Sequence, residues 1–207
     1  MGQSAVSRQN RRSGATSAPR LSIFATGFGW CGIGRIEQHV SDILIGHTGP
    51  EAVRQAFQQR LLDIGLPTDF QESDWLPGLR RRLEDYGLGK AVTFDDLEVD
   101  LPPGTAFQAR IRAVTRSIPY GEKWTYGELA HRAGFPRAAR AVGSVMASNR
   151  LPILIPCHRV VASAGKLGGF SAPQGLDLKS RLLDMEAEGV QARPRRVGQR
   201  SASRSAD

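Results

Sequence analysis

The run from Ile153 to Val161 restricts the fold of this chain more than any other segment does. It reads Ile-Leu-Ile-Pro-Cys-His-Arg-Val-Val, so a cysteine, a histidine and an arginine stand together between two apolar stretches. Aliphatic and β-branched residues in so short a run predict a buried strand. Pro156 disfavours a helical approach to Cys157, because the residue before a proline avoids the α region and proline lacks an N–H donor. We therefore expect the Cys157 thiol to lie where regular structure ends.

Two interpretations of Cys157 follow from this segment. A free cysteine among apolar residues is most often a small, inert core residue. A cysteine near an imidazole is also the usual form of an activated thiol nucleophile, since the imidazole stabilises the thiolate. Adjacent residues of an extended strand point in opposite directions, so we expect a water molecule to link His158 to Cys157. The segment alone leaves both interpretations open.

Charge is distributed unevenly along the 207 residues, whose formal net charge is +8. The two ends, 1–20 and 190–207, each contribute +4, while 21–105 carries −6 and 106–189 carries +6. Halves of opposite sign imply two domains, and a basic half favours a polyanionic partner such as nucleic acid. The alternative is a pair of solvated surfaces that differ by chance.

Cysteine usage and hydropathy bear on the cellular compartment. The two cysteines, Cys31 and Cys157, form no CxxC motif and no disulfide framework, which favours a reducing interior. Cys31 lies in a glycine-rich stretch and is interpreted as structural. The sequence shows no zinc-ligand cluster, no apolar run of membrane-spanning length and no secretory signal. We expect a protein that is neither secreted nor bound to a membrane.

Composition and turn residues divide the chain into four segments. We expect a disordered basic arm at 1–20, an N-terminal α/β support domain at 21–104, a second domain at 105–189, and a disordered Arg-rich tail at 190–207. Leu101-Pro102-Pro103-Gly104 is the predicted linker between the domains.

Within the first domain, the pattern predicts an antiparallel meander followed by two helices and a strand. Its strands are Leu21–Thr26 and Val40–Ile45, separated by a turn with glycines at 27, 29, 32 and 34. Apolar residues at helical spacing then predict one helix starting at Pro50 and another ending near Gly87, and strand character returns at Ala91–Leu101.

Capping signals organise the second domain. Thr105 with Gln108, and Thr125 with Glu128, each form a capping box that predicts the start of a helix. Pro136 stands at the expected first position of a further helix over 137–148. Two short helices around a Gly-Phe-Pro turn predict a helix-turn-helix, although a helical hairpin in any core would look the same.

Small side chains dominate the second of these helices. Ala139, Ala141 and Gly143 leave no long donors with which to distinguish base edges in a major groove. A smooth helix can instead approach a narrow groove closely. Arg140 is the one long cation among these small residues.

The last helix carries a carboxylate on its apolar stripe. Leu178, Leu182 and Glu186 follow at intervals of four residues, so they share one face. A buried, unpaired charge is costly, so Glu186 requires an internal partner. Glu188 lies off the stripe and is expected to face solvent.

These patterns coincide with a known family. Residues 105–189 resemble the O6-alkylguanine-DNA alkyltransferases, DNA-repair proteins that move an alkyl group from guanine onto their own cysteine. The related alkyltransferase-like proteins carry tryptophan at the position of Cys157, so the resemblance favours a working acceptor. The shared motifs, in the family's order and spacing, are Pro119-Tyr120-Gly121-Glu122, Thr125-Tyr126, Ala138-Ala139-Arg140-Ala141-Val142-Gly143, Asn149, Pro156-Cys157-His158-Arg159, and Leu182-Leu183 followed by Glu186.

The resemblance implies a fold and an activity. The fold is α/β, with a small, ribonuclease-H-like N-terminal domain built on an antiparallel sheet and a C-terminal winged helix-turn-helix-like alkyltransferase domain. The activity is that of a single-turnover methylated-DNA–protein-cysteine S-methyltransferase acting on O6-alkylguanine, with O4-alkylthymine as a further candidate substrate. The expected partner is double-stranded DNA, bound in the minor groove with little sequence preference and with the guanine flipped out. We expect no cofactor or metal, a monomer, and a location in the cytoplasm or nucleus, wherever genomic DNA is held.

The resemblance also implies roles for individual residues. Cys157 accepts the alkyl group, His158 takes its proton through water, and Glu186 holds the imidazole. Asn149 is the hinge between the helix predicted over 137–148, the recognition helix, and the cysteine segment, residues 151–161. Arg140 enters the base stack. The other implied DNA contacts are Tyr126, Ala139, Ala141, Gly143 and Arg159, and the implied substrate pocket comprises Tyr126, Val160, Phe170 and Ser171.

Three positions depart from the family pattern. Arg150 replaces the proline that commonly follows the hinge asparagine, Phe170 replaces tyrosine, and Ala187 replaces glycine. Arg150 could loosen the hinge or contact a phosphate. These departures and the Arg-rich ends motivate an alternative function, a DNA-binding sensor that recognises alkyl lesions without repairing them.

Overall fold

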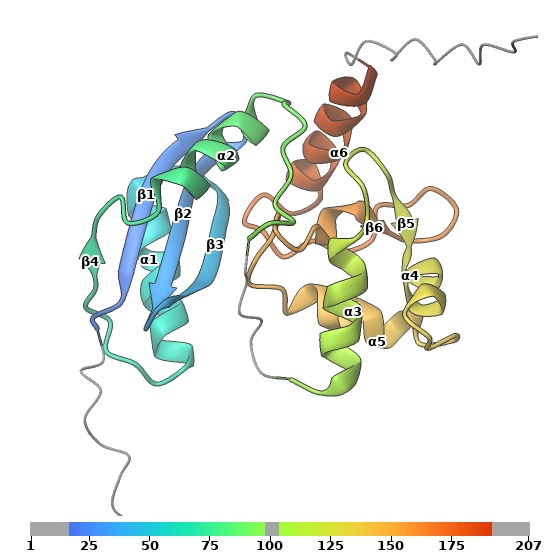
Figure 1. The fold of residues 1–207 in the computed structure, drawn as a ribbon, viewed down its shortest axis with the longest axis horizontal. Helices are drawn as coiled ribbons and strands as arrows, with labels where there is room; N and C mark the ends of the chain where they lie inside the picture. The colour runs from blue at the N-terminus through green and yellow to red at the C-terminus, as the bar shows by residue number, and fades with distance from the viewer. Residues whose placement is uncertain (1–16, 98–103, 192–207) are drawn as a thin grey trace, which may run out of the picture.

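The computed structural model describes residues 17–97 and 104–191 and shows a sheet-containing half beside a helical half (Figure 1). This confirms the predicted α/β class. Most of the predicted arm and tail and nearly all of the predicted linker lie outside the described residues. Within the described ranges, none of the helices is long and apolar enough to cross a membrane.

A four-stranded sheet forms the first half, in the order β3-β2-β1-β4. Its three long strands are β1 (Arg20–Thr26), β2 (Gly29–Ile36) and β3 (His39–His47), and neighbours among them pair antiparallel. The short β4 (Gln71–Glu72) pairs parallel to β1 and was not predicted.

The glycine-rich stretch predicted as a turn is strand β2, so that prediction was wrong. Its glycines serve packing against the helix above. A Cβ on Gly32 would lie 2.6 Å from Val53 Cγ1, and one on Gly34 would lie 2.5 Å from Phe57 Cε2. Glycine lets the helix approach the strand closely, which the turn-forming tendency of glycine conceals in the sequence.

Two helices cover opposite faces of this sheet (Figure 1). The predicted α1 (Pro50–Asp63) buries its apolar stripe, Val53, Phe57 and Leu61, against one face, and α2 (Pro77–Gly87) packs on the other. Both begin with proline, as the first-turn preference predicts. The predicted strand at Ala91–Leu101 is wrong for residues 91–97, which contain no strand, and its remainder lies outside the described residues.

The second half is built from α3 (Ala106–Arg116), α4 (Tyr126–Arg132), α5 (Ala139–Ala147) and α6 (Gly175–Gln191). Both predicted capping boxes are present, at Thr105 and Thr125. The next helix starts later than predicted, because Pro136 belongs to a turn that ends with Arg137 at φ 78°. A parallel pair of two-residue strands, β5 (Trp124–Thr125) and β6 (Val160–Val161), completes this half.

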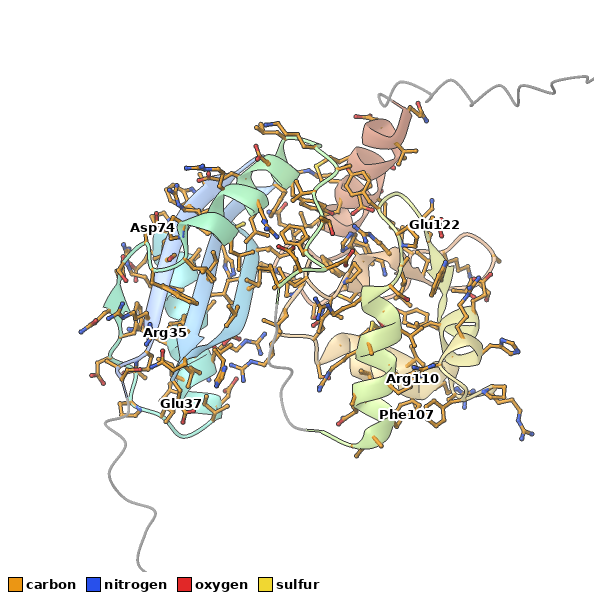
Figure 2. The ribbon with its side chains drawn as sticks, in the orientation of Figure 1. Arg35, Glu37, Asp74, Phe107, Arg110 and Glu122 are labelled. Atoms are coloured by element: carbon orange, nitrogen blue, oxygen red, sulfur yellow. The ribbon has the colours of Figure 1, made fainter. Side chains whose placement is uncertain are left out.

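Helix α3 is tied to the turn between α4 and α5. Phe107 and Arg110, both labelled in Figure 2, lie on α3. The Phe107 ring packs edge-on against Phe135 with centroids 4.8 Å apart, and Arg110 Nε donates to the Ala133 carbonyl at 3.4 Å. These contacts fix the turn between α4 and α5 to α3.

One cluster of buried hydrophobic side chains extends across both halves. Residues of β1, β2, β3 and α2 pack against Leu151, Ile153 and Ile155 of the cysteine segment and against Leu178 and Leu182 of α6. The first half is therefore packed directly behind the cysteine segment.

A buried ion pair joins the halves at Arg150. Its Nε and Nη2 atoms donate to the two carboxylate oxygens of Asp42, both at 2.9 Å, and its carbonyl accepts from the Ile43 amide at 2.9 Å. Asp42 is fully buried, and Arg60 of α1 approaches it at 3.6 Å. Arg150 therefore ties the residue after Asn149 to β3, and the expected looser hinge or phosphate contact stays a prediction.

We predict that Asp42→Asn lowers the free energy of unfolding by about 3 kcal/mol, because it leaves the partly buried Arg150 without its carboxylate. Asp96→Asn is the control, since Asp96 forms an exposed pair with Arg82. That change should cost no more than about 1 kcal/mol. Urea denaturation measures both, and equal losses would contradict the importance of the buried pair.

Candidate active site

Cys157 opens a short 3-10 helix, Cys157–Arg159, instead of lying on a strand. The apolar run before it forms a turn, in which Ile153 has a φ of 72° and the Ile155 amide donates to the Leu151 carbonyl at 2.8 Å. The predicted strand was therefore wrong except at Val160–Val161, where β6 begins. Cys157 thus lies at the start of a 3-10 helix and not at the point where a strand ends.

Asn149 holds the cysteine segment to the end of α5. Its Nδ2 donates to the Ile155 carbonyl at 2.8 Å and to Cys157 Sγ at 3.1 Å, and its Oδ1 accepts from the Leu151 amide at 3.1 Å. The side chain is buried, so these bonds face no competition from bulk water. Asn149 therefore fixes the position of the sulfur.

Burial favours the protonated form of the Cys157 thiol. Burial raises the pKa of Cys157 above its ordinary value, although the hydrogen bond from Asn149 and the charge of Lys179 oppose the shift. Cys31 is shielded further, since burial in β2 raises its pKa to about 12. The placement of Cys31 in the core agrees with a structural role.

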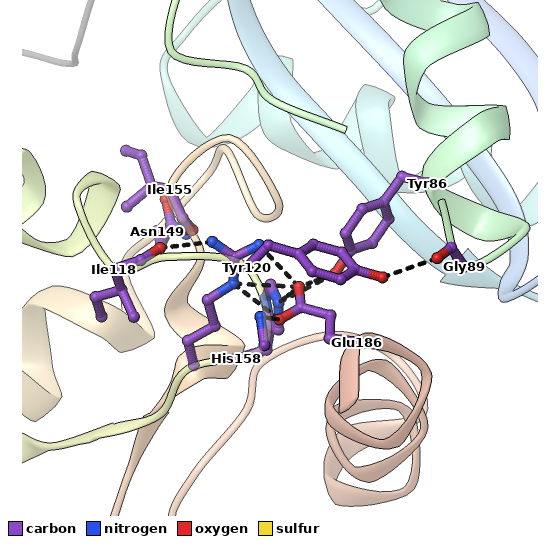
Figure 3. A network of polar contacts seen from close by, with 10 residues as sticks. Tyr86, Gly89, Ile118, Tyr120, Asn149, Ile155, His158 and Glu186 are labelled. Atoms are coloured by element: carbon purple, nitrogen blue, oxygen red, sulfur yellow. Dashed lines mark hydrogen bonds and ion pairs between the residues drawn. The ribbon is translucent and has the colours of Figure 1, made fainter. Parts of the chain in front are cut away.

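His158 follows Cys157 and is completely buried. Its Nε2 lies 2.9 Å from Glu186 Oε1 and 3.1 Å from the Tyr86 hydroxyl (Figure 3). A nitrogen that faces a carboxylate carries the proton in neutral imidazole, so the lone pair falls on Nδ1. Nδ1 is buried and has no hydrogen-bond partner among the described residues. It is therefore free to accept a proton.

Glu186 is the internal carboxylate that the sequence predicted on α6, and it is fully buried. It accepts hydrogen bonds from Tyr86 at 2.6 Å, from the Gly121 amide at 3.0 Å, and from Arg159 at distances down to 2.8 Å. Burial alone would raise its pKa, but hydrogen bonds and charge from His158 and Arg159 outweigh burial and hold the pKa well below the ordinary value. Glu188 is exposed, as expected.

Arg159 points into the core, which corrects its predicted place at the DNA surface. Its Nε and Nη2 atoms bond to Glu186, and its Nη1 donates to the Ile118 carbonyl at 2.7 Å. The buried carboxylate requires a cation, and Arg159 supplies it. The positive charge of Arg159 is therefore paired with Glu186 inside the protein.

A cavity of about 200 Å³ opens beside Cys157. Three of the four residues predicted for the substrate pocket line this cavity. The fourth, Val160, is fully buried and does not line it. The Val160 carbonyl accepts from Lys179 Nζ at 2.6 Å. The cavity is lined by Tyr126, Gly143, Met146, Ala147, Cys157, Gly169, Phe170 and Ser171.

The outer face of α5 adjoins this cavity. Arg140 and Ala141 are exposed, and Ala139 and Gly143 are partly exposed, while Val142, Val145 and Met146 face the core. Arg140, Ala139 and Gly143 also line a second, open hollow with Tyr126. The cavity beside Cys157 and the hollow beside Arg140 share Tyr126 and Gly143, so the predicted groove-facing surface adjoins the cysteine cavity.

Two buried residues of this network, Lys179 and Tyr86, were not predicted from the sequence. Lys179 of α6 donates to the carbonyls of Val160 and Gly169, and burial lowers its pKa to about 8. Its position next to Leu178 on the apolar stripe was a usable signal. Tyr86 comes from α2 in the other half, and its helical spacing from Leu79 and Leu83 indicates burial but not its polar partners.

Across residues 17–97 and 104–191, no group of three or more histidine, cysteine or acidic side chains lies close enough to hold a metal ion.

Comparison with known proteins identifies relatives for most of the chain. Residues 106–188 match the model of the 6-O-methylguanine DNA methyltransferase, DNA binding domain. A methylated-DNA–protein-cysteine methyltransferase of Methanosarcina barkeri is 38% identical over 156 residues, which cover 75% of this chain and 96% of that protein. Its counterpart in Methanosarcina acetivorans is 46% identical over 107 residues, or 51% of this chain and 65% of that protein.

A solved structure extends the likeness to the fold. The Mycobacterium tuberculosis OGT protein, crystallised in complex with DNA, aligns with a TM-score of 0.61 and 28% sequence identity. The alignment covers 82% of this chain and 94% of that one, so it includes both halves.

We predict that Glu186→Gln lowers the free energy of unfolding by about 3–5 kcal/mol at pH 7, because the buried Arg159 loses its counterion. Glu188→Gln, on the exposed side of the same helix, should change stability by less than about 0.5 kcal/mol. Chemical denaturation of both variants measures the difference. Similar stabilities would mean that the carboxylate contributes no net charge stabilisation.

The pH dependence of the free energy of unfolding tests the same ion pair between Glu186 and Arg159. A carboxylate whose pKa is depressed in the folded state stabilises fully above the ordinary pKa of about 4, and this stabilisation is lost as the pH falls toward the folded-state value. The stability gap between wild type and Glu186→Gln should therefore narrow when the pH falls from 7 to about 3. A gap that stays constant would show that Glu186 is not ionised.

Proposed function

The chain belongs to the methylated-DNA–protein-cysteine methyltransferase family, and from this membership we propose that it repairs DNA by moving the alkyl group of O6-alkylguanine onto Cys157. The observation that carries the proposal is the position of Cys157. It lines a cavity of about 200 Å³, and the next residue, His158, is paired with Glu186. A structural cysteine requires neither the cavity nor the paired imidazole.

The transfer is a displacement at carbon. The Cys157 proton passes through a water molecule to His158 Nδ1, and the thiolate attacks the alkyl carbon. A sulfur–carbon bond forms, the carbon–O6 bond breaks, and the departing guanine takes up a proton. The thioether is stable, so each protein molecule acts once. No cofactor or metal enters these steps.

Three neighbouring residues support this chemistry. Glu186 fixes the tautomer and stabilises the imidazolium that forms, because its carboxylate lies 2.9 Å from His158 Nε2. Asn149 donates to Cys157 Sγ, and a hydrogen bond to the charged form favours the thiolate. The protonated Lys179 adds a favourable charge.

The cavity receives the flipped guanine. Ser171 donates toward O6 once its hydroxyl turns from the Ala147 carbonyl, to which it donates at 3.3 Å. Tyr126 contacts the base and the neighbouring phosphate, and Phe170 closes the rim. The carbonyls of Cys157 and Val160 accept from the exocyclic amine, and for Val160 this requires its second lone pair, since Lys179 uses the first. Extrusion of a base costs a few kcal/mol, and less when the lesion weakens pairing.

Double-stranded DNA is the partner, bound through the helix-turn-helix of α4 and α5. The small exposed residues Ala139, Ala141 and Gly143 suit the minor groove, where close approach matters more than base reading. Arg140, exposed on the same helix, fills the space of the extruded nucleotide. The proposed minor-groove mode has little sequence preference.

Several finer assignments are part of this proposal. Residues 21–104 act as a ribonuclease-H-like support domain, and 105–189 as a winged helix-turn-helix-like alkyltransferase domain. The protein works as a monomer wherever genomic DNA is held, in the cytoplasm or nucleus. O4-alkylthymine is a candidate second substrate.

We predict one added methyl group per chain, on Cys157, after incubation with O6-methylguanine duplex DNA. Peptide mass spectrometry locates the group. Cys157→Ser should remain unmodified while it still binds DNA, because a neutral hydroxyl is a poor nucleophile. Cys31→Ser is the matched control and should react like wild type. Lesion binding without transfer by the wild-type protein would favour the sensor function instead.

We predict that Arg140→Ala slows repair of duplex DNA at least about tenfold, because the cost of unstacking the base is no longer offset. Reaction with free O6-benzylguanine should change little, since a free base needs no extrusion. Arg81→Ala, which removes an exposed charge from the other half, controls for charge alone. Equal slowing of both substrates by Arg140→Ala would contradict the proposed role.

A further inference from the structure

Tyr86 reaches the proposed catalytic network from the opposite half of the protein. It lies on α2 and is fully buried, and its hydroxyl donates to Glu186 Oε1 at 2.6 Å. The same hydroxyl lies 3.1 Å from His158 Nε2, which itself lies 2.9 Å from Glu186 Oε1. The three groups form a closed triangle (Figure 3).

Aromatic packing holds the Tyr86 ring in place. Phe28, Phe94, Tyr120 and His158 each meet it edge-on, with ring centroids 6.1 to 6.4 Å apart. Edge-to-face contacts of this kind are favourable and directional. The hydroxyl therefore has a defined position from which to donate to Glu186.

We propose that Tyr86 is a positioning residue for alkyl transfer, through which the sheet half sets the basicity of His158. Its hydroxyl shares the negative charge of Glu186 Oε1 and so weakens the pull of the carboxylate on the imidazole proton. His158 then remains neutral, with a free Nδ1, at physiological pH. The proposal rests on the proposed function, since His158 matters only as the acceptor of the Cys157 proton.

Other charged groups around His158 do not replace this effect. Burial lowers the pKa of His158, Glu186 opposes the shift, and Arg159 and Lys179 add to it. Only Tyr86 and Glu186 are hydrogen-bonded to Nε2 among the described residues. Burial and then the charge of Glu186 raise the pKa of Tyr86 well above its ordinary value, so it remains a neutral donor throughout the working pH range.

The test is the pH dependence of methyl transfer from duplex DNA carrying one O6-methylguanine, at saturating DNA. In Tyr86→Phe, Glu186 interacts more strongly with the imidazolium, so the pKa of His158 rises and its neutral form requires a higher pH. The acid limb of the rate profile should move up by about one pH unit, a tenfold slower reaction below the limb. The rate should return to that of wild type at high pH.

Tyr120→Phe is the matched control. Tyr120 packs on the same aromatic cluster, and its hydroxyl donates to the Gly89 carbonyl at 3.0 Å, away from Nε2. Its loss removes a comparable hydrogen bond and should leave the position of the acid limb unchanged. A rate loss in Tyr86→Phe that is uniform with pH, or an unchanged profile, would overturn the proposal.

A change of opposite sign guards against a folding defect in Tyr86→Phe. Incorporation of 3-fluorotyrosine at position 86 keeps the ring and makes the hydroxyl a stronger donor, so the acid limb should move to lower pH. Movement in the other direction, or none, would contradict the proposed role. Absence of transfer by wild type would instead refute the proposed function, which separates the two failures.

Discussion

The carboxylate of Glu186 is the interaction on which the arrangement of this protein depends. A buried charge costs several kcal/mol unless donors surround it, and here the donors come from three parts of the chain. Tyr86 comes from α2, Gly121 from the turn after α3, and His158 and Arg159 from the 3-10 helix. Helix α6 carries the carboxylate itself. One charge therefore fixes the relative positions of four elements.

The surroundings of Cys157, the proposed nucleophile, favour an unreactive form at rest. Burial holds the Cys157 thiol in its protonated form, and protonated thiols react slowly with electrophiles. His158 Nδ1 has no hydrogen-bond partner within residues 17–97 and 104–191, so the proposed acceptor for the proton is available. The active thiolate then forms only when a path for the proton is complete. Such an arrangement suits an acceptor that cannot be regenerated.

Local patterns in the sequence predicted the helices well, and they failed where distant segments decide the structure. The capping boxes at Thr105 and Thr125 and the stripe ending at Glu186 depend on neighbours within one helix, so they can be recognised from spacing. The glycines of β2 were predicted to form a turn. Gly32 and Gly34 instead allow α1 to pack closely on the strand, which spacing within the strand does not reveal. Arg159 was assigned to the surface, because nothing local shows that the carboxylate of Glu186, 27 residues away, needs a cation. Tyr86 was missed for the same reason.

Two of the contacts between the halves lie on either side of the Cys157 thiol and link the sheet half to the proposed site. Arg150 directly follows Asn149, which contacts the Cys157 sulfur, and Asp42 of β3 holds Arg150 with two hydrogen bonds. Tyr86 of α2 acts at the other end of the cysteine segment, on His158. The sheet half therefore restrains the segment on both sides of the thiol. The two halves carry opposite net charge, and Asp42 of the acidic half pairs with Arg150 of the basic half at this junction. The difference in charge therefore contributes to the contact between the halves as well as to the basic surface.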